Sequence, residues 1–139
     1  MSDNNTLYVD IISPEKPVYS GQALAITARA HDGEVGIRPG HAPMVTKLGI
    51  GEVRVTRGTL ANAVTDRFAI KQGYLEVSNN HVVILSEDAR AIADLKGVNP
   101  EDIARIRKQI DETKDPAERA KLQADLEWLK ASDKLLKGV

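Results

Sequence analysis

Apolar and polar residues alternate with a period of two along the N-terminal part of the chain, up to about Leu85. Residues 7–13, 24–29 and 52–57 show the alternation expected of strands with one buried face. Prolines and glycines punctuate these segments at intervals of about eight to twelve residues, which is typical of the turns in all-β domains. The pattern therefore predicts an antiparallel β-sandwich or flattened barrel built from short strands.

A β-hairpin is predicted near the end of this segment. Residues 67–71 form one strand, and residues 74–77 pair with residues 82–85 across Asn79 and Asn80. Asparagine tolerates the left-handed backbone that a tight two-residue turn requires. We therefore expect these two asparagines to form the turn of the hairpin.

The period changes after Ser86 from that of a strand to that of a helix. Ser86 can cap a short helical turn through Glu87, Asp88 and Ala89, which we expect to end near Gly97. The chain is thus expected to consist of a β-sandwich head, residues 1–86, and a helical tail, residues 87–139. This is an α+β fold in which the helices follow the sheet.

The tail has the pattern of an antiparallel two-helix hairpin. Asn99 is a suitable N-cap, Pro100 fits the first helical position, and the acidic residues that follow favour the positive end of the helix dipole. Asp115, Pro116 and Glu118 repeat this start signal, so a tight break separates the two helices. The apolar stripe of the first helix consists of Ile103, Ile106 and Ile110.

The second helix has two apolar faces. One face carries Leu122, Leu126, Leu129 and Leu136. The other face carries Ala117, Ala120, Ala124, Trp128, Ala131 and Leu135. A hairpin needs only one face for its own seam, so the second face predicts contact with the head, with another subunit, or with both in turn.

Composition excludes several kinds of chemistry. The chain has 139 residues, 42% hydrophobic and 28% charged, with a net charge of -1, as in ordinary globular proteins. This balance gives no basis for binding nucleic acid or an anionic membrane surface. The absence of cysteine removes disulfides, thiolate catalysis and cysteine-based metal sites. No apolar run approaches the roughly 18 residues that cross a bilayer, and we expect no export signal at the polar N-terminus.

The remaining residues do not form a recognisable catalytic or metal site. His31, His41 and His81 lack the spacing of a zinc motif, so we expect no metal. Glu87 and Asp88 are adjacent near a predicted helix start, where acidic residues normally complement the dipole. No serine lies in a nucleophile elbow, and no glycine run has the spacing of a phosphate-binding loop. We therefore expect a non-enzymatic protein without a cofactor.

Residues 32–44 are the most distinctive stretch of the sequence, with three glycines and two prolines. Glycine permits positive φ and proline fixes φ, so we expect a stiff loop that presents Glu34, Arg38 and His41. Ordered surface loops commonly carry recognition residues, although a tight crossover between sheets is the alternative.

This stretch resembles the motif Gly-x-x-Gly-hydrophobic-x-Pro-Gly-His-Ala-Pro of the epsilon subunits of bacterial and chloroplast F-type ATP synthases. The matching residues are Gly33, Gly36, Ile37, Pro39, Gly40, His41, Ala42 and Pro43. The resemblance continues through Leu48 and Gly51 to residues 73–77 and 83–85, and then into both predicted helices. It therefore covers nearly the whole chain.

The resemblance implies a non-catalytic rotor subunit of the central stalk, which couples ion flow through the c-ring to rotation of gamma and ATP synthesis. In this family the sandwich binds the foot of gamma and the polar loops of the c-ring, with Glu34 toward the c-ring and His41 with its neighbours nearer gamma. The implied interface residues are Glu34, Arg38, Pro39, Gly40, His41, Ala42, Pro43 and Met44. The implied location is peripheral, on the cytoplasmic face of the bacterial cell membrane, through the complex.

The family also implies a regulatory role for the tail. The hairpin can fold against the sandwich, or extend beside gamma toward the alpha and beta catalytic subunits and inhibit ATP hydrolysis. The expected contacts with acidic segments there are Arg105, Arg107, Lys108, Arg119 and Lys121. Ordinary solvated surface charge is the alternative interpretation of these residues.

Some relatives bind ATP through a Leu/Ile-Asp-x-x-Arg-Ala motif at the start of the hairpin. The corresponding positions here are Leu95, Lys96, Gly97, Val98, Asn99 and Pro100. These positions lack the acidic residue, the arginine and the alanine, so we expect no ATP binding at that site.

A competing interpretation is a stand-alone β-sandwich binding module. Such a module would use the glycine-proline loop for a small ligand or peptide, and the hairpin for dimerisation. Co-purification with gamma and the c-ring distinguishes the two interpretations. The coupling ion, proton or sodium, is set by c-ring residues and not by this chain.

Overall fold

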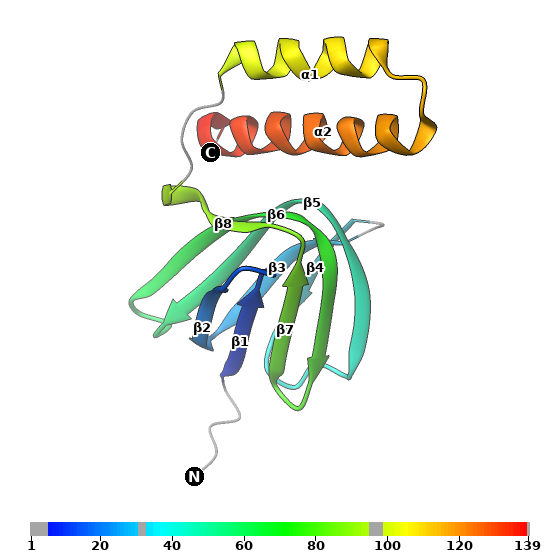
Figure 1. Cartoon of the computed structure of the whole chain (residues 1–139). Coiled ribbons are helices and arrows are strands. Elements are labelled where there is room, and N and C mark those ends of the chain that lie inside the picture. Colours follow the sequence, from blue (N-terminus) through cyan, green and yellow to red (C-terminus); the bar gives the residue numbers. More distant parts are fainter. Residues whose placement is uncertain (1–5, 31–32, 95–98, 139) are drawn as a thin grey trace. The chain divides into compact units, whose positions relative to one another are not determined.

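A computed structural model describes residues 6–30, 33–94 and 99–138 of the chain, without the side chains of 94 and 136–138. The chain divides into two compact units, Met1–Asp94 and Leu95–Val139. The first is a β-sandwich and the second is a pair of helices (Figure 1). His31, Asp32 and positions 95–98 of the compared ATP motif lie outside the described residues, and Leu136 lies outside the described side chains.

In the described residues, the first unit contains eight strands and a short 3₁₀ helix, and the second contains two α-helices. In chain order these elements are β1 (Leu7–Ile12), β2 (Pro17–Ala23), β3 (Ala25–Ala30), β4 (Gly33–Ile37), β5 (Met44–Gly58), β6 (Ala63–Ser78), β7 (His81–Ser86), β8 (Ala89–Ala91), η1 (Ile92–Asp94), α1 (Pro100–Glu112) and α2 (Pro116–Gly138). The predicted order, a β-sandwich followed by two helices, is confirmed.

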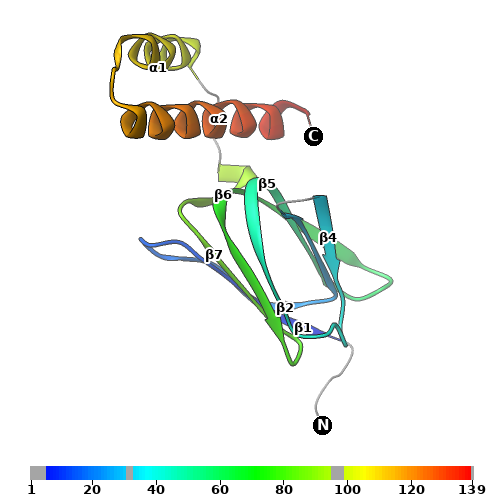
Figure 2. The same ribbon diagram turned by 90° about the vertical axis from the view of Figure 1, so that its right-hand side faces the viewer.

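The strands are hydrogen-bonded in the order β2-β1-β7-β6-β5-β3-β4, and β8 pairs with β6 beside this path. Most neighbours are antiparallel, as the short turns predict, but β1 and β7 are parallel because the chain crosses the sandwich between them. In Figure 2, β7 lies at one side of the sandwich and β4 at the other. The sheet is thus folded over on itself without closing into a barrel.

Strands β5 and β6 are long enough to belong to both layers of the sandwich. Their ladder runs without a slip from Met44 paired with Val77 to Gly58 paired with Ala63. Gly73, with a φ of 153°, marks the point in β6 where pairing passes from β7 to the part of the sheet that carries β8. A Cβ atom at Gly73 would overlap the carbonyl oxygen of Leu85, so only glycine allows this close approach.

The core lies between the two layers and is made of the inward-facing residues that the period-two pattern predicts. Val9 and Ile11 of β1, Leu75 of β6 and Ile84 of β7 are fully buried in one cluster. Ile37, at the end of β4, joins the same cluster from the other layer. Each such side chain contributes roughly 1.5–3 kcal/mol through burial of its apolar surface.

The predicted helical turn after Ser86 is wrong. β7 continues to Ser86, and residues Ala89–Ala91 form strand β8, which pairs with β6 through Phe68, Ala69 and Ile70. The Ser86 hydroxyl does accept a hydrogen bond from the backbone N–H of Asp88, as a capping serine would, at 3.3 Å. Pairing with β6 overrides the local helical signal, and within residues 87–94 helical backbone is confined to η1.

The helical hairpin begins and turns where the sequence predicts. Asn99 caps α1 by accepting a hydrogen bond from the N–H of Glu101 at 3.0 Å, and Pro100 occupies the first turn. Asp115 performs the same role for α2, because its carboxylate accepts from the N–H of Ala117 at 3.0 Å. Both helix starts therefore use the expected polar caps.

One apolar face of α2 forms the seam of the hairpin. The seam contains Ile103, Ile106 and Ile110 of α1 with Leu122, Leu126 and Leu129 of α2. The second predicted face, which carries Trp128 and the alanines, takes no part in this described cluster. In the part of the chain that the structure describes, neither helix combines the length and the apolar character needed to cross a membrane.

Candidate functional site

The glycine-proline stretch forms a tight turn between β4 and β5. The N–H of His41 donates to the carbonyl oxygen of Arg38 at 3.1 Å, which closes a four-residue turn. Pro39 occupies its second position, and Gly40, with a φ of 90°, occupies its third. This is the arrangement of a type II turn, in which proline sets the first dihedral and glycine permits the positive one. We call residues 38–43 the turn segment.

Two further contacts hold the turn segment. The backbone N–H of Gly40 donates to the side-chain oxygen of Asn80 at 2.7 Å, which joins the segment to the turn between β6 and β7. Nδ1 of His41 lies 2.7 Å from the carbonyl oxygen of Ala42. A carbonyl only accepts, so Nδ1 carries a proton and donates to it.

The structure brings most of the predicted interface residues together but separates one of them. Arg38, Ala42 and Pro43 are exposed around the turn, whereas Met44 begins β5 and packs against the core. Residues Gly33–Ile37 are strand β4, so the expected loop over 32–44 is shorter than predicted. Glu34 lies near the start of β4, four residues and roughly 13 Å of strand from Arg38.

One outer face of the sandwich carries several exposed apolar side chains. Its exposed apolar side chains are Tyr8, Ile12, Val45, Tyr74 and Leu85, which we call the apolar outer face. The strand register places the exposed side chains of Lys47, Glu76 and His81 among them on the same face. Tyr74 and Leu85 are directly paired between β6 and β7, and Leu85 is also paired with Ile12 of β1. The exposed fractions of Val45, Tyr74 and Leu85 are 67%, 55% and 52%. Ile12, Leu85 and Tyr74 thus form a continuous exposed apolar row across three strands, and such a row is a candidate interaction site.

The apolar outer face adjoins the turn segment along the chain. Val45 lies two residues after Pro43, and Tyr8 donates its N–H to the carbonyl oxygen of Asn80 at 2.8 Å. Sequence reasoning missed this face. The available signal was consecutive apolar pairs, such as Ile11 with Ile12, because in a strand only one member of such a pair can point to the core.

The outer face of β3, β4, β5 and β6 is charged instead. Glu52 lies 3.4 Å from Arg54 and 2.5 Å from Arg67, and these two arginines are directly opposite in the ladder. Like charges in this position repel, and Glu52 offsets the repulsion. Arg54 also lies 3.5 Å from Glu34, whose side chain is 63% exposed. The charged outer face therefore suits a polar partner surface, and the apolar outer face suits an apolar one.

A polar network lies on the same sheet face as the apolar outer face and includes Tyr8. Nε2 of His81 lies 2.8 Å from one oxygen of Asp10, and the hydroxyl of Ser20 donates to the other at 2.7 Å. Tyr8 contacts Ser20 through its hydroxyl at 2.9 Å and packs edge-on against His81. The hydrogen bonds from His81 and Ser20 lower the pKa of the Asp10 carboxyl, because they stabilise its charged form.

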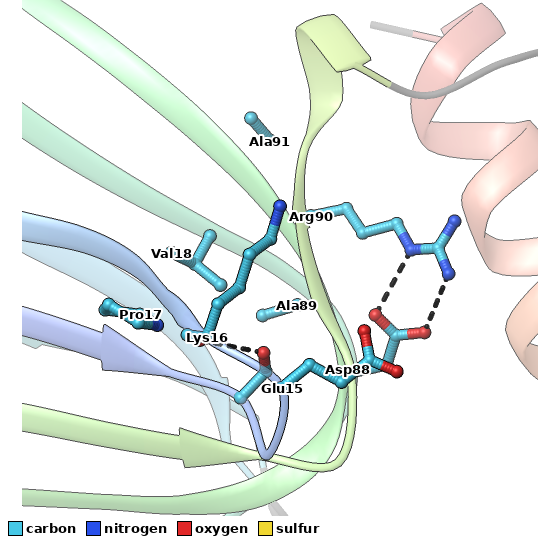
Figure 3. A pocket seen from close by; sticks show the side chains of 9 residues that line it. Glu15, Lys16, Pro17, Val18, Asp88, Ala89, Arg90 and Ala91 are labelled. Carbon is cyan, nitrogen blue, oxygen red and sulfur yellow. Dashed lines mark hydrogen bonds and ion pairs between the residues drawn. The ribbon is translucent and has the colours of Figure 1, made fainter.

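A cavity of about 330 Å³ lies between the turn that follows β1 and strand β8 (Figure 3). Arg90 and Asp88 form a two-pronged ion pair at its edge, with both contacts at 3.2 Å. The remaining charged lining residues are Glu15 and Lys16, so cationic and anionic side chains balance. This balance gives the cavity no preference for an anion or a cation.

The five predicted tail cations are exposed on the hairpin. Arg105 pairs with Asp102 at 3.3 Å, and Lys108 lies 4.0 Å from Glu112. Arg119 donates to the carbonyl oxygen of Thr113 at 2.8 Å, which closes the turn between the helices. Exposed pairs of this kind contribute about 0.2–1 kcal/mol each, so a partner with stronger negative charge can compete for these side chains.

The fold and the site define a class: an open β-sandwich followed by a helical hairpin, with an exposed turn and an apolar sheet face as its distinguishing surfaces. Residues 6–92 match the family model described as ATP synthase, Delta/Epsilon chain, beta-sandwich domain. The chain belongs to this family of ATP synthase delta/epsilon chains. The resemblance first noted in residues 33–43 is thereby confirmed.

Curated relatives that match over most of the chain are named ATP synthase epsilon chain. The relative from Anoxybacillus flavithermus is 37% identical over 119 residues, which cover 86% of this chain and 78% of the relative. The relative from Lactobacillus gasseri is 34% identical over 131 residues, which cover 93% of this chain and 90% of the relative. The similarity therefore includes the helical tail.

Solved structures show the same fold at lower identity. A chain of the Euglena gracilis mitochondrial ATP synthase, in an OSCP/F1/c-ring structure, matches with a TM-score of 0.71 at 20% identity, covering 95% of this chain and 82% of that chain. A chain of the Tetrahymena thermophila mitochondrial ATP synthase, in a central stalk/c-ring structure, matches with a TM-score of 0.67 at 17% identity, covering 94% of this chain and 96% of that chain.

Proposed function

We propose that this chain is the epsilon subunit of the central stalk of a bacterial F-type ATP synthase. In this role it is non-catalytic and couples ion flow through the c-ring to rotation of gamma and to ATP synthesis. It would work on the cytoplasmic face of the cell membrane and be held there by its partners. The family match and the epsilon chains among its relatives support this proposal.

The observation that carries the proposal is the apolar outer face beside the turn segment. Tyr74 and Leu85 are more than half exposed on a regular sheet, where an isolated protein gains nothing from them. Aromatic and aliphatic side chains on such a face are typical anchors of protein interfaces. We assign this face, together with Arg38, His41 and the rest of the turn segment, to the contact with gamma.

Glu34 suits a different partner. It lies on the charged outer face, and its contact with Arg54 is long and exposed, so the carboxylate can accept hydrogen bonds from another chain. We assign Glu34 to the contact with the polar loops of the c-ring. Glu34→Gln keeps the size of the side chain but removes the charge, so it should weaken this contact while binding to gamma is retained.

The tail is assigned a regulatory role. The seam of the hairpin uses one face of α2, so the second apolar face lies outside the seam, and the five cations are exposed. Contact of these cations with acidic segments of the catalytic alpha and beta subunits would hold the rotor and inhibit ATP hydrolysis. The role of Arg105, Arg107, Lys108, Arg119 and Lys121 in this contact is part of the proposal.

Affinity purification from native membranes tests the proposal. A tagged full-length chain should retain gamma and the c-ring, and Leu85→Ser combined with Tyr74→Ser should lose gamma. Leu60→Ser is the matched control, because Leu60 is 94% exposed but lies in the loop between β5 and β6, away from the apolar outer face. Wild-type protein that retains no ATP synthase subunit would refute the proposal and favour the stand-alone binding module.

A further inference from the structure

Asn80 contacts the turn segment although it lies outside the glycine-proline motif. Its side-chain oxygen accepts the N–H of Gly40 at 2.7 Å, across 40 positions of sequence. Its backbone carbonyl accepts the N–H of Tyr8 at 2.8 Å. One residue thus touches both the turn segment and the strand that carries Tyr8 of the apolar outer face.

The turn that contains Asn80 does not require asparagine at this position. Asn79 and Asn80 have φ values of 51° and 62°, and the flanking residues Ser78 and His81 are paired. This is a two-residue turn with both central residues left-handed, in which glycine is the preferred second residue. Glycine would therefore adopt the left-handed backbone at position 80 at least as easily as asparagine. Asparagine adds the side-chain oxygen that reaches Gly40.

The hydrogen bond to Gly40 distinguishes between two forms of the neighbouring turn. Type I and type II turns share the contact between Arg38 and His41 but differ by a flip of the peptide between Pro39 and Gly40. The contact between the N–H of His41 and the carbonyl oxygen of Arg38 leaves the Gly40 N–H without a partner inside the turn. Asn80 supplies that partner only in the observed orientation, because the flip would turn the N–H away from it.

We propose that Asn80 is a positioning residue of the gamma-binding surface. By accepting the Gly40 N–H it holds the peptide between Pro39 and Gly40 in the type II orientation and so fixes where the neighbouring His41 and Arg38 are presented. Because Asn80 also accepts the Tyr8 N–H, the same residue keeps the turn segment in register with the apolar outer face. This inference rests on the proposed function of that surface.

Three variants of the full-length chain separate the effect of the hydrogen bond between Asn80 and Gly40 from the effect of the turn backbone at Asn79 and Asn80. Asn80→Gly keeps the left-handed backbone but removes the oxygen, whereas Asn80→Asp retains an oxygen that accepts from Gly40. Asn79→Gly places the same glycine one position earlier, where no contact to Gly40 is lost. Comparison of the two glycine variants isolates the side chain of Asn80 from the flexibility that glycine introduces.

Two measurements test the inference. In the ¹H–¹⁵N spectrum, the Gly40 amide proton should move upfield in Asn80→Gly and stay near its wild-type position in Asn80→Asp and Asn79→Gly. Affinity for purified gamma, measured by calorimetry, should fall about threefold to tenfold in Asn80→Gly, as expected for one lost hydrogen bond. It should change less than about twofold in Asn79→Gly.

An unchanged Gly40 resonance in Asn80→Gly would show that the Asn80 side chain does not hold the Gly40 N–H. Equal losses of affinity for gamma in Asn80→Gly and Asn79→Gly would contradict the positioning role. A Gly40 resonance that moves away from its wild-type position in Asn80→Asp would also count against a hydrogen bond between these two residues. If wild-type protein does not bind gamma, the proposed function and the positioning role for gamma both fail. The Gly40 resonance would still show whether Asn80 holds the turn, so the two failures are distinguishable.

Discussion

Nε2 of His81 lies 2.8 Å from the carboxylate of Asp10, although the two residues are 71 positions apart. Asp10 is on β1 and His81 begins β7, so the contact joins the N-terminal strand to a strand from the end of the sandwich. Ser20 of β2 donates to the same carboxylate. One side chain therefore links three adjacent strands on the outer surface of the sheet.

The Asp10 carboxylate should make the stability of the sandwich depend on pH in the acid range. Its pKa is lowered in the folded state, so its stabilising effect is complete above the unfolded value of about 3.9 and is lost as pH falls through the lower folded value. Asp10→Asn should reduce the free energy of unfolding by about 0.2–1 kcal/mol at neutral pH. The difference from wild type should disappear toward pH 2.

Urea unfolding at a series of pH values, followed by far-ultraviolet circular dichroism, measures this difference. Ser20→Ala removes the hydrogen bond that lowers the pKa of Asp10 less than the one from His81 does, and it should shift stability in the same direction by a smaller amount. A gap between wild type and Asp10→Asn that stays constant down to pH 2 would show that the carboxylate charge is not responsible.

Gly73 should be intolerant of any side chain. A Cβ atom would overlap the carbonyl oxygen of Leu85, and the φ of 153° disfavours other residues. We expect Gly73→Ala to lower the free energy of unfolding by about 2–4 kcal/mol. Gly49→Ala is the matched control, because a Cβ there meets nothing within 4 Å, and it should unfold like wild type in urea. Equal midpoints for the two variants would contradict the overlap.

Tight ATP binding is not expected for this chain. The motif positions compared earlier lack the acidic residue and the arginine, but an Asp-x-x-Arg spacing does occur six residues later, at Asp102 and Arg105 in the first two turns of α1. These two side chains pair with each other at 3.3 Å, and isoleucine replaces the alanine that follows in the motif. Isothermal titration of ATP into the full-length chain should show no tight binding.

A positive titration would require a second measurement to locate the site. Asp102→Asn and Arg105→Gln would abolish binding if the displaced spacing forms the site. Lys96→Ala would instead abolish ATP binding if the residues just before the hairpin form the site.

Removal of the tail should raise ATP hydrolysis in membranes while ATP synthesis continues, because the proposed inhibitory contacts are lost with it. The structure places the cut after Asp94, since a chain that ends at Ser86 would lose β8 and its pairing with Phe68. The shorter chain should assemble poorly and serves as the contrasting variant. Hydrolysis equal to that of wild type in the chain that ends at Asp94 would remove the regulatory role.

Local chemistry made parts of the fold predictable. The turn at Asn79 and Asn80 and the helix starts at Asn99 and Asp115 each depend on residues within a few positions of one another. Tight turns and helix caps can therefore be predicted from the local sequence. The same holds for the turn closed by Arg38 and His41.

Other features depend on partners that are distant in the chain. β8 forms because β6 offers an edge to Ala89–Ala91, and that pairing overrides the local helical pattern. The apolar outer face becomes a surface only when Ile12, Tyr74 and Leu85 are placed side by side by the strand register. The link between Asn80 and Gly40 likewise requires two turns to meet. No local pattern indicates which distant segments will be neighbours.

The continuity of β5 and β6 through both layers has a mechanical consequence. In a sandwich whose layers are joined only by loops, the sheets can slide past one another when opposite faces are pulled. Here the ladder from Met44 with Val77 to Gly58 with Ala63 keeps one register on both sides of the bend, so sliding would have to rupture hydrogen bonds along both strands together. A twisting load applied to one outer face is therefore passed to the other through covalent backbone rather than through side-chain friction.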